Sequence, residues 1–446
     1  MKRFHLNPVQ TLLLGFAGVI LTGALLLTLP IASTSGTSVG FLSALFTSTS
    51  AVCVTGLIVV DTGLQFTTFG HIVIIALIQI GGLGFMTTAM ILYFIVSKRI
   101  TLRERLTLQE SLGESHMKGI VKLTRRAIFL TFCTEAVGAL LLMIRFVPIY
   151  GAKGIWYGVF HAISAFCNAG FDIFGEYVSL TGFVSDPLVI LTIGFLIIIG
   201  GLGFAVVFDI FKPRSEHRSL QTKIVLTTTA ALLVVGTSIF FIAEYTNAKT
   251  LGSLSMGGKV LAAWFQSVTP RTAGFNSIDQ NVLTPASLLV TMILMFIGAS
   301  PASTGGGIKT TTLAVLVLSI RSVIRGRKDV ECFHRRLTSD VVSRAVAVIA
   351  IYLMAVLGFT TIISINEWIV GSGISLDNTI YTVISAFGTV GLSVGNTGDF
   401  APLSQVFLIL GMYAGRVGPL SLMLAFMRNN SSASAVRFPE ERLMIG

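Results

Sequence analysis

Four short segments of this chain share a residue pattern that suits the binding of a small cation. They read SAVCVTGL (50–57), SAFCNAGF (164–171), VTPRTAGF (268–275) and SAFGTVGL (385–392). The seventh residue of each is glycine (Gly56, Gly170, Gly274 and Gly391), and successive glycines are 114, 104 and 117 residues apart. Glycine adopts positive φ readily and lets chains approach closely. Four such loops can present backbone carbonyls that replace the water shell of one desolvated ion.

Each segment follows a short helix-like stretch, and both lie between two long apolar stretches. A bilayer-spanning helix needs about 20 apolar residues, whereas the short stretches near 39–51, 153–165, 257–268 and 376–386 hold about a dozen. At about 1.5 Å per residue they cannot cross the membrane, so they must enter and return on one side. The returning backbone must be buried in protein or line a water-filled path. The eight long stretches lie near 9–29, 70–96, 127–148, 187–211, 222–245, 286–318, 343–365 and 403–427.

This order predicts an all-α polytopic membrane protein with four tandem helix, pore-helix, filter-loop, helix repeats around a pseudo-fourfold pore, as in potassium channels. Composition agrees, because 53% of the 446 residues are hydrophobic, 11% are charged and the mean hydropathy is +0.85. Lipid must therefore be the main solvent. The predicted units are repeat 1 (1–98), repeat 2 (120–212), repeat 3 with a broken second helix (220–325), repeat 4 (340–428) and a cytoplasmic tail (429–446).

The basic residues predict the orientation in the membrane. With the N-terminus inside, 24 of the 31 lysines and arginines fall in cytoplasmic segments, against five for the opposite orientation. We expect a multi-pass protein of the bacterial cytoplasmic membrane with both termini inside, and the charge of +11 then indicates topology, with no nucleic acid as partner. A signal peptide is the alternative for the N-terminus, but the apolar run exceeds the usual 7–15 residues.

Metal and redox chemistry find little support in the sequence. The six histidines show no HExxH or other ligand spacing, and the four cysteines show no metal or disulfide spacing. We expect no enzyme activity, no catalytic residues and no metal site other than one formed for potassium by backbone carbonyls. Cys53 and Cys167 stand three residues before their glycines, which favours packing.

These residues together resemble the Trk/Ktr/HKT superfamily of potassium transporters, most closely the bacterial Ktr membrane subunit. The resemblance covers essentially the whole chain. It rests on the four segments in order, TPRTAGFN (269–276), the glycine-rich ASPASTGGGIKTTT (299–312) and Arg416 in the last span. Trk-type members carry an extra helix pair before the first repeat, whereas the first span here leads directly to the first filter, which points to the Ktr branch.

The resemblance implies a function and partners. In the family, glycine in all four filters accompanies preference for potassium, whereas serine in the first accompanies sodium transport in some plant relatives. The family also implies a homodimer with one pore per protomer, bound to a cytoplasmic ring of nucleotide-binding (RCK/KTN-type) subunits. The GGLGF runs at 81–85 and 200–204 lack the third glycine and following acidic residue of a dinucleotide site. We therefore expect no nucleotide on this chain itself, and a regulator that is a separate polypeptide.

Two sets of residues are predicted to carry the function. The 299–312 segment should break the sixth span and form, by resemblance, an intramembrane gate beneath the third filter; kinking for helix packing is the alternative. The predicted gating residues are Thr304, Gly305, Gly306, Gly307, Ile308, Lys309, Thr310 and Arg416. The predicted ion-binding residues are Val52, Cys53, Val54, Thr55, Gly56, Phe166, Cys167, Asn168, Ala169, Gly170, Pro270, Arg271, Thr272, Ala273, Gly274, Phe387, Gly388, Thr389, Val390 and Gly391.

Several charged residues carry two interpretations each. Arg416 either forms a barrier to cations below the filter, as the resemblance implies, or pairs with a buried acid. Arg271 is expected to point behind the third filter and to tie the loop to the pore helix or to Asn276. Acidic residues beyond the filters either concentrate cations at the outer mouth or are ordinary solvated carboxylates. They are Asp61, Asp172, Glu176, Asp279 and Asp399.

The sequence thus predicts the ion-translocating subunit of a bacterial potassium uptake system. Carbonyl geometry decides between potassium and sodium, so a sodium-selective protein stays an alternative. An alternating-access cation carrier is the other, although such carriers usually have two repeated halves. Dependence of uptake on sodium is left open by the sequence.

Overall fold

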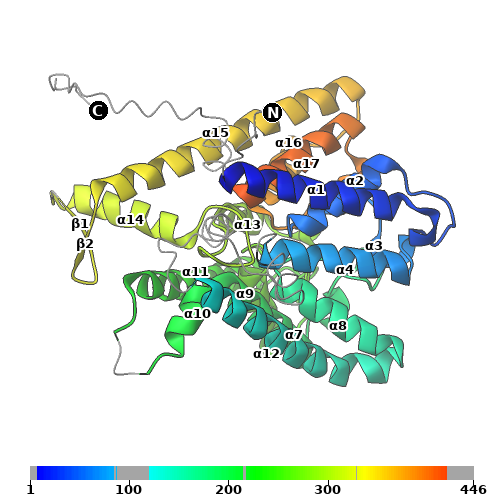
Figure 1. Ribbon diagram of the computed structural model, residues 1–446, viewed down its shortest axis with the longest axis horizontal. Helices are drawn as coiled ribbons and strands as arrows, with labels where there is room; N and C mark the ends of the chain where they lie inside the picture. Colours follow the sequence, from blue (N-terminus) through cyan, green and yellow to red (C-terminus); the bar gives the residue numbers. More distant parts are fainter. Residues whose placement is uncertain (1–7, 85–86, 88–119, 214–216, 328, 419–446) are drawn as a thin grey trace, which may run out of the picture.

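The computed structural model describes residues 8–84, 87, 120–213, 217–327 and 329–418. This part of the chain is almost entirely helical, with one short β-hairpin, which confirms the predicted all-α class (Figure 1). The predicted tail 429–446, the second half of the apolar stretch 70–96 and the end of 403–427 lie outside the described residues.

Each repeat begins with a long helix followed by a short one. The long helices are α1 (Pro8–Thr28), α7 (Ile120–Tyr150), α11 (Leu220–Glu244) and α15 (Ser339–Val370). All four are long and apolar enough to cross a membrane, and side chains such as Phe129, Leu140 and Ile144 on α7 are exposed, as lipid contact requires. The short helices match the four predicted stretches. They are α2 (Phe41–Val52), α8 (Lys153–Phe166), α12 (Met256–Val268) and α16 (Leu376–Gly388).

The second apolar stretches of repeats 2 and 3 are not straight helices. Repeat 2 bends by 102° between α9 (Pro187–Leu202) and α10 (Phe204–Ile210), so the expected continuous span over 187–211 is wrong. Repeat 3 is interrupted between α13 (Pro285–Phe296) and α14 (Thr310–Ile324), as predicted. α4 (Thr68–Leu83) and α17 (Pro402–Val417) each end at a glycine with positive φ, Gly84 and Gly418. Only glycine adopts such a conformation at little cost.

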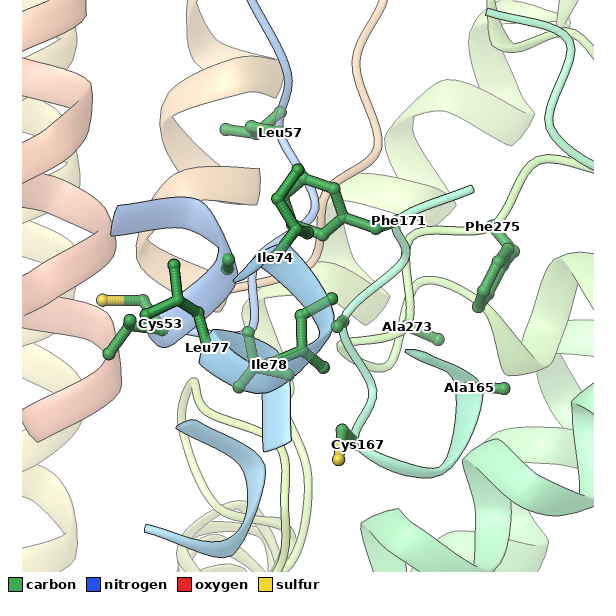
Figure 2. Packing of buried hydrophobic residues seen from close by; sticks show 14 of the residues in the cluster. Cys53, Leu57, Ile74, Leu77, Ile78, Ala165, Cys167, Phe171, Ala273 and Phe275 are labelled. Atoms are coloured by element: carbon green, nitrogen blue, oxygen red, sulfur yellow. The ribbon is translucent and has the colours of Figure 1, made fainter. Parts of the chain in front are cut away.

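Contacts between repeats close a ring. Each second helix packs on the short helix of the next repeat: α4 on α8, α9 on α12, α13 on α16 and α17 on α2. Figure 2 shows one of these junctions, where Ile74, Leu77 and Ile78 of α4 lie between Cys53 of the first segment and Cys167 of the second. The last repeat therefore meets the first, and the four segments are brought around one axis.

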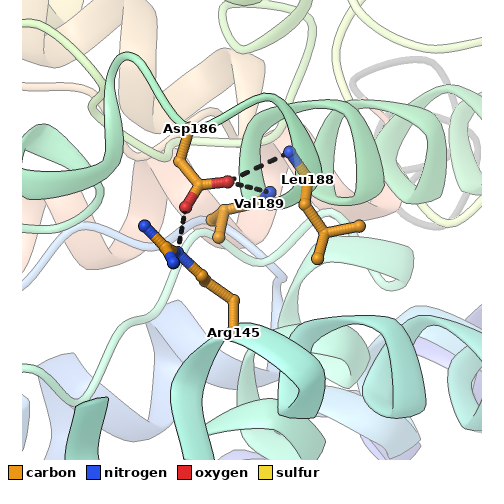
Figure 3. A network of polar contacts seen from close by, with 4 residues as sticks. All are labelled: Arg145, Asp186, Leu188 and Val189. Atoms are coloured by element: carbon orange, nitrogen blue, oxygen red, sulfur yellow. Dashed lines mark hydrogen bonds and ion pairs between the residues drawn. The ribbon is translucent and has the colours of Figure 1, made fainter. Parts of the chain in front are cut away.

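In three repeats, polar contacts join the C-terminal end of the long helix to the start of the second helix. In repeat 2, Arg145 of α7 lies 2.5 Å from Asp186, whose other oxygen accepts from the Leu188 and Val189 amides at the start of α9 (Figure 3). In repeat 3, Glu244 of α11 accepts from the Thr284 amide (2.8 Å) before α13. Glu367 of α15 does the same for the Ala401 amide (3.0 Å) before α17. These carboxylates stabilise helix N-termini that a proline opens.

The remaining elements are short. They are α3 (Thr62–Gln65), the 3₁₀ turns η1 (Pro30–Ala32), η2 (Thr181–Phe183), η3 (Gln280–Val282) and η4 (Thr397–Asp399), and strands β1 (Val330–Cys332) and β2 (Arg335–Leu337). The antiparallel β1–β2 hairpin lies at the opposite end of the molecule from α3 (Figure 1).

Candidate ion pathway

The four predicted glycines meet in a closed ring. A Cβ placed on Gly56 would lie 3.2 Å from the Gly170 Cα, and one on Gly170 would lie 2.9 Å from the Gly274 Cα. The same construction places Gly274 against Gly391 (3.2 Å) and Gly391 against Gly56 (3.0 Å). Each such Cβ would also strike the carbonyl oxygen before the neighbouring glycine, on Ala169, Ala273, Val390 and Thr55 respectively. The ring therefore has no room for a side chain and is lined by backbone oxygen.

The backbone of the four loops follows one pattern. The ring glycines have φ of 88°, 69°, 79° and 96°, and the residues two positions earlier, Val54, Asn168, Thr272 and Thr389, are also positive at 57°, 60°, 70° and 50°. The residues between them have negative φ. A non-glycine residue in this conformation costs about 1–3 kcal/mol and concentrates at functional sites. Four equivalent strained residues thus show that the surrounding structure imposes the loop geometry.

Hydroxyl groups at the ends of the short helices hold these loops in place. Ser50 Oγ accepts from the Gly56 amide and Ser385 Oγ from the Gly391 amide, both at 3.0 Å. Ser164 Oγ donates to the Phe171 carbonyl and Thr269 Oγ1 to the Phe275 carbonyl, both at 2.7 Å. These four residues were missed from sequence. The first position of three segments is serine, which was the available signal, but Thr269 occupies the second position of its segment.

One side of the glycine ring opens into a cavity of about 680 Å³, here called the vestibule. It has room for about 20 water molecules at their liquid volume. Its walls include all four ring glycines and three of the five predicted mouth acids, Asp172, Glu176 and Asp279. Asp61 and Asp399 are not among the lining residues; Asp61 instead accepts from the Leu64 amide (2.9 Å) and the Tyr177 amide (3.1 Å).

The other side of the ring is covered by the interruption of the third repeat, residues 297–309, here called the inner loop. A Cβ on Gly305 would strike Thr272 Oγ1, and one on Gly306 would strike Thr389 Oγ1, so the loop lies beneath the third and fourth segments. It is attached to the second repeat, where the Ser300 and Thr304 amides donate to the Gly201 (3.0 Å) and Gly200 (3.2 Å) carbonyls.

The rest of the predicted gating residues also lie in or against the inner loop. Thr304 Oγ1 donates to the Phe166 carbonyl (3.1 Å), and Lys309 Nζ donates to the Gly305 carbonyl (3.0 Å). Ile308 pairs with Ile297 across the base of the loop in a parallel bridge, and Gly307 has φ of 67°. The Thr310 amide donates to the Ala299 carbonyl (3.3 Å) where α14 begins. The structure thus brings together every residue of this predicted set.

Arg416 connects the inner loop to the first repeat. Its Nη1 donates to the Thr304 carbonyl, and its Nη2 donates to the carbonyls of Gly81 and, at 3.4 Å, Gly82 at the end of α4. The alternative of a buried acidic partner is wrong for the described residues, because its hydrogen-bond acceptors there are carbonyl oxygens. The inner loop of the third repeat is thus bonded to the second repeat directly and to Arg416 of the fourth, which links it to the first.

The local sequence around Arg416 corresponds to the GGLG runs of the first two repeats. Gly81, Gly200 and Gly415 occupy equivalent places, since a Cβ on each would strike a carbonyl of its own repeat, on Val52, Phe166 and Phe387 respectively. These glycines allow the helices to approach the segments closely. Aligned on these glycines, Arg416 stands where the other runs have Gly82 and Gly201. The guanidinium therefore breaks the fourfold pattern below the ring.

Arg271 and the two cysteines at equivalent positions, Cys53 and Cys167, lie behind the segments. Arg271 is buried, as expected, but its side chain donates to the Thr229 carbonyl of α11 (3.5 Å), so the expected tie to the pore helix or Asn276 is wrong. Cys53 and Cys167 are buried and free. Cys167 Sγ lies 3.8 Å from Glu135, a buried carboxyl of α7 that also accepts from Gln79 (3.3 Å). Glu135 was missed from sequence, although it is the single acid of the apolar stretch 127–148.

The remaining predicted filter residues belong to the same four loops. Asn168 and Thr272 contact each other from neighbouring repeats, with the Asn168 amide 3.1 Å from Thr272 Oγ1. Pro270 precedes Arg271 in the third loop, and a Cβ on Gly388 would lie 2.6 Å from the Met295 carbonyl of α13. All twenty residues therefore belong to the four loops or to the ends of the short helices that lead into them.

The fold and this geometry define a polytopic helical membrane protein whose four repeats converge on one backbone-lined pathway. The family model of the TrkH cation transport proteins matches residues 15–437. The chain belongs to the TrkH family of cation transport proteins and is similar to Ktr membrane proteins.

Individual relatives match this chain over nearly its full length. The chain is 42% identical to the Ktr system potassium uptake protein B of Bacillus subtilis, covering 100% of this chain and 98% of the relative. It is 39% identical to the potassium/sodium uptake protein NtpJ of Enterococcus hirae, covering 100% and 98%. Among solved structures, the potassium transporter TrkH of Vibrio parahaemolyticus matches with a TM-score of 0.73 at 16% identity, covering 96% of this chain and 86% of that one. The last comparison supports the fold.

Proposed function

We propose that this chain is the membrane-embedded, ion-translocating subunit of a bacterial potassium uptake system. In this proposal the vestibule faces outward, potassium loses its water at the glycine ring, and the backbone carbonyls of the four loops replace that water. The closed ring of Gly56, Gly170, Gly274 and Gly391 is the single observation that carries the proposal. The names of the relatives in B. subtilis and E. hirae support potassium as the ion.

The short helices support a cation in this position. α2, α8, α12 and α16 all end at the four loops, so their partly negative C-termini point toward the ring. The strained φ values at Val54, Asn168, Thr272 and Thr389 fix the carbonyls before an ion arrives. A pathway built in this way avoids reorganisation when the ion enters.

The inner loop is proposed to be the gate. It lies across the axis and is attached to the second repeat through Gly200 and Gly201 and to the first and fourth through Arg416. We propose that a separate cytoplasmic nucleotide-binding ring, bound to a homodimer of this chain, displaces the loop when uptake is required.

The experiment is potassium and sodium uptake in a potassium-uptake-deficient bacterium, with and without a regulatory subunit. The wild-type chain should restore growth on low potassium, and the regulatory subunit should increase the rate. A Gly56→Ser variant should be inserted in the membrane at the same level but discriminate less against sodium. Failure of the wild-type chain to restore potassium uptake with its regulator would end the proposal.

We also propose that external sodium activates potassium uptake; the name of the E. hirae relative, a potassium/sodium uptake protein, links the two ions. The same cells, assayed with and without external sodium at fixed potassium, test it. A rise in the potassium uptake rate with sodium supports the role, and an unchanged rate contradicts it.

A further inference from the structure

The chain that follows the second filter loop is longer than its three counterparts. α9 begins 17 residues after Gly170, whereas α4, α13 and α17 begin 12, 11 and 11 residues after their ring glycines. The longer connection contains residues 175–180, here called the outer bridge, of which residues 176–179 line the vestibule. The vestibule wall therefore departs from the fourfold pattern of the ring below it.

Backbone hydrogen bonds join the outer bridge to the repeats on either side. The Tyr177 amide donates to Asp61 Oδ2 of repeat 1 (3.1 Å). Toward repeat 3, Ser179 Oγ accepts from the Asn276 amide (3.1 Å), and the Leu180 amide donates to the Asn276 carbonyl (2.8 Å). Ser179 and Leu180 are both buried. The outer bridge is thus attached to both neighbouring repeats.

The backbone of the outer bridge has a conformation that residues with a side chain rarely adopt. Gly175, Glu176, Tyr177 and Ser179 have φ of 90°, 57°, 56° and 48°. Non-glycine residues keep such a conformation only where the surrounding contacts impose it. The attachments to repeats 1 and 3 therefore fix the direction in which the Tyr177 side chain leaves the backbone.

The side chain of Tyr177 reaches the repeat on the opposite side of the ring. It makes a hydrogen bond with the side chain of Asn396 in repeat 4, and both residues line the vestibule. Repeats 2 and 4 are not neighbours, because the helix contacts close the ring in the order 1, 2, 3, 4. Since Tyr177 also contacts Asp61, this connection passes repeat 1. An ion cannot pass between two hydrogen-bonded side chains, so the vestibule is closed along this line.

The wall of the vestibule on the side of repeat 3 is built from a different part of the chain. It is lined by Lys249, Thr250, Ser253 and Leu254, which belong to the connection between α11 and α12. Lys249 is exposed, and it is the only basic residue among the described residues that line the vestibule. A cation that passes this wall meets a positive charge.

We propose that the contact between Tyr177 and Asn396 closes the vestibule beside repeat 1, so that cations enter off the axis of the ring, on the side of repeat 3, past Lys249. The inference rests on the proposed function, in which the vestibule faces outward, and adds the route of entry. A lysine at this entrance lowers the local concentration of cations. An entrance on one side also restricts the size of the solutes that reach the glycine ring.

The test measures how fast a cationic thiol reagent reaches the floor of the vestibule. Ser393 lines the vestibule two residues after Gly391, so Ser393→Cys supplies a target in the full-length chain, expressed in cells with its regulatory subunit. A trimethylammonium methanethiosulfonate is applied outside the cells, and the modified fraction is measured by mass on the purified protein. The chain without Ser393→Cys gives the background from the four native cysteines.

Tyr177→Ala and Asn396→Ala should each increase the modification rate several-fold, because either change opens a second entrance beside repeat 1. Val178→Ala is the matched control. It shortens another exposed side chain of the outer bridge that lines the vestibule, and it should leave the rate unchanged.

Lys249 provides a second measurement. Lys249→Gln should raise the modification rate roughly twofold, the scale of one unit charge acting through water. The increase should be smaller in the Tyr177→Ala background, where a second route avoids the lysine. Lys259→Gln is the control for charge, because Lys259 also belongs to repeat 3 but donates to the Tyr245 carbonyl (3.1 Å) and is not among the residues that line the vestibule.

The outcomes are distinct once the melting temperature in detergent has shown which variants fold. A folded Tyr177→Ala protein with the wild-type modification rate overturns the closed side of the vestibule. A rate that ignores Lys249→Gln overturns entry past the lysine. A Ser393→Cys protein that reacts only from the cytoplasmic side overturns the outward-facing vestibule of the proposed function instead, and the same comparison in inside-out membranes then decides whether Tyr177 closes one side.

Discussion

The two proposed effects of Arg416, a charge that repels cations and a clamp that holds the inner loop, can be separated by substitution. The guanidinium donates through Nη1 to Thr304 and through Nη2 to Gly81, so it bridges the loop and the end of α4. Arg416→Lys keeps the positive charge but has one nitrogen, which cannot reach both carbonyls in this geometry. Arg416→Ala removes both the charge and the bridge.

The size of the effect follows from the bond that lysine loses. A hydrogen bond to a charged group contributes about 1.5–3 kcal/mol. Because about 1.4 kcal/mol corresponds to a tenfold change in an equilibrium, the closed-to-open ratio of the loop should fall roughly 10- to 150-fold. We therefore expect Arg416→Lys to raise potassium flux nearly as much as Arg416→Ala when the regulatory subunit is absent.

The assay is potassium flux through purified protein in liposomes without the regulatory subunit. Thermal melting of each variant in detergent shows that the fold is retained. A lysine variant with the wild-type flux beside an alanine variant with raised flux would refute the clamp and leave the charge barrier. If neither substitution changes the flux, Arg416 has no part in gating.

Three further outcomes follow from the same contacts. Ser385→Ala leaves the partly buried Gly391 amide without its acceptor, which costs up to about 3 kcal/mol. The ratio of potassium to sodium uptake should therefore fall; an unchanged ratio would show that the hydroxyl does not position the loop. Glu244→Ala removes the acceptor of the Thr284 amide and hydroxyl and should lower the melting temperature in detergent. Arg145→Ala breaks an ion pair whose arginine is 53% exposed, so it should change the free energy of unfolding by less than about 1 kcal/mol. Replacing residues 304–307 by a shorter linker should make flux independent of the regulatory subunit, and flux that still requires the regulator would contradict the inner loop as gate.

The convergence of the four segments could be predicted from the sequence because the repeat makes them equivalent. Four glycines in one register, each after a helix too short to cross a bilayer, allow few arrangements other than convergence on one axis. The break at residues 299–312 could also be predicted, since proline and consecutive glycines weaken any helix. The ends of the short helices could also be predicted, because each helix leads into a segment that contains the glycine of the shared register.

Other features depend on contacts that no single segment reveals. The 102° bend at Gly203 falls within a run that is apolar on both sides. Hydropathy does not indicate whether the helix axis changes direction there. The cause of the bend is tertiary, because the Phe204 amide donates to the Ala302 carbonyl of the inner loop (3.0 Å). The partners of Arg416 and Arg271 are backbone carbonyls. Every residue has a backbone carbonyl, so the sequence does not indicate which of them accepts a hydrogen bond.

The position of the loop-holding hydroxyls shows a limit of a different kind. Ser50, Ser164 and Ser385 occupy the first position of their segments, whereas Thr269 occupies the second because the third loop reaches its glycine one residue sooner. Alignment on the glycines alone hides this equivalence. Glu135 is marked in the sequence as the single acid of its apolar stretch. Its partners Gln79 and Cys167 come from other elements, so they could not be predicted from that stretch.

The central claim is that four lengths of main chain replace the water around one monovalent cation at the glycine ring. Anomalous scattering from crystals grown with rubidium, a potassium analogue, locates such an ion directly. We predict density on the axis between the carbonyl oxygens of Thr55, Ala169, Ala273 and Val390. Rubidium bound elsewhere in the protein, with none at this level, would contradict the account.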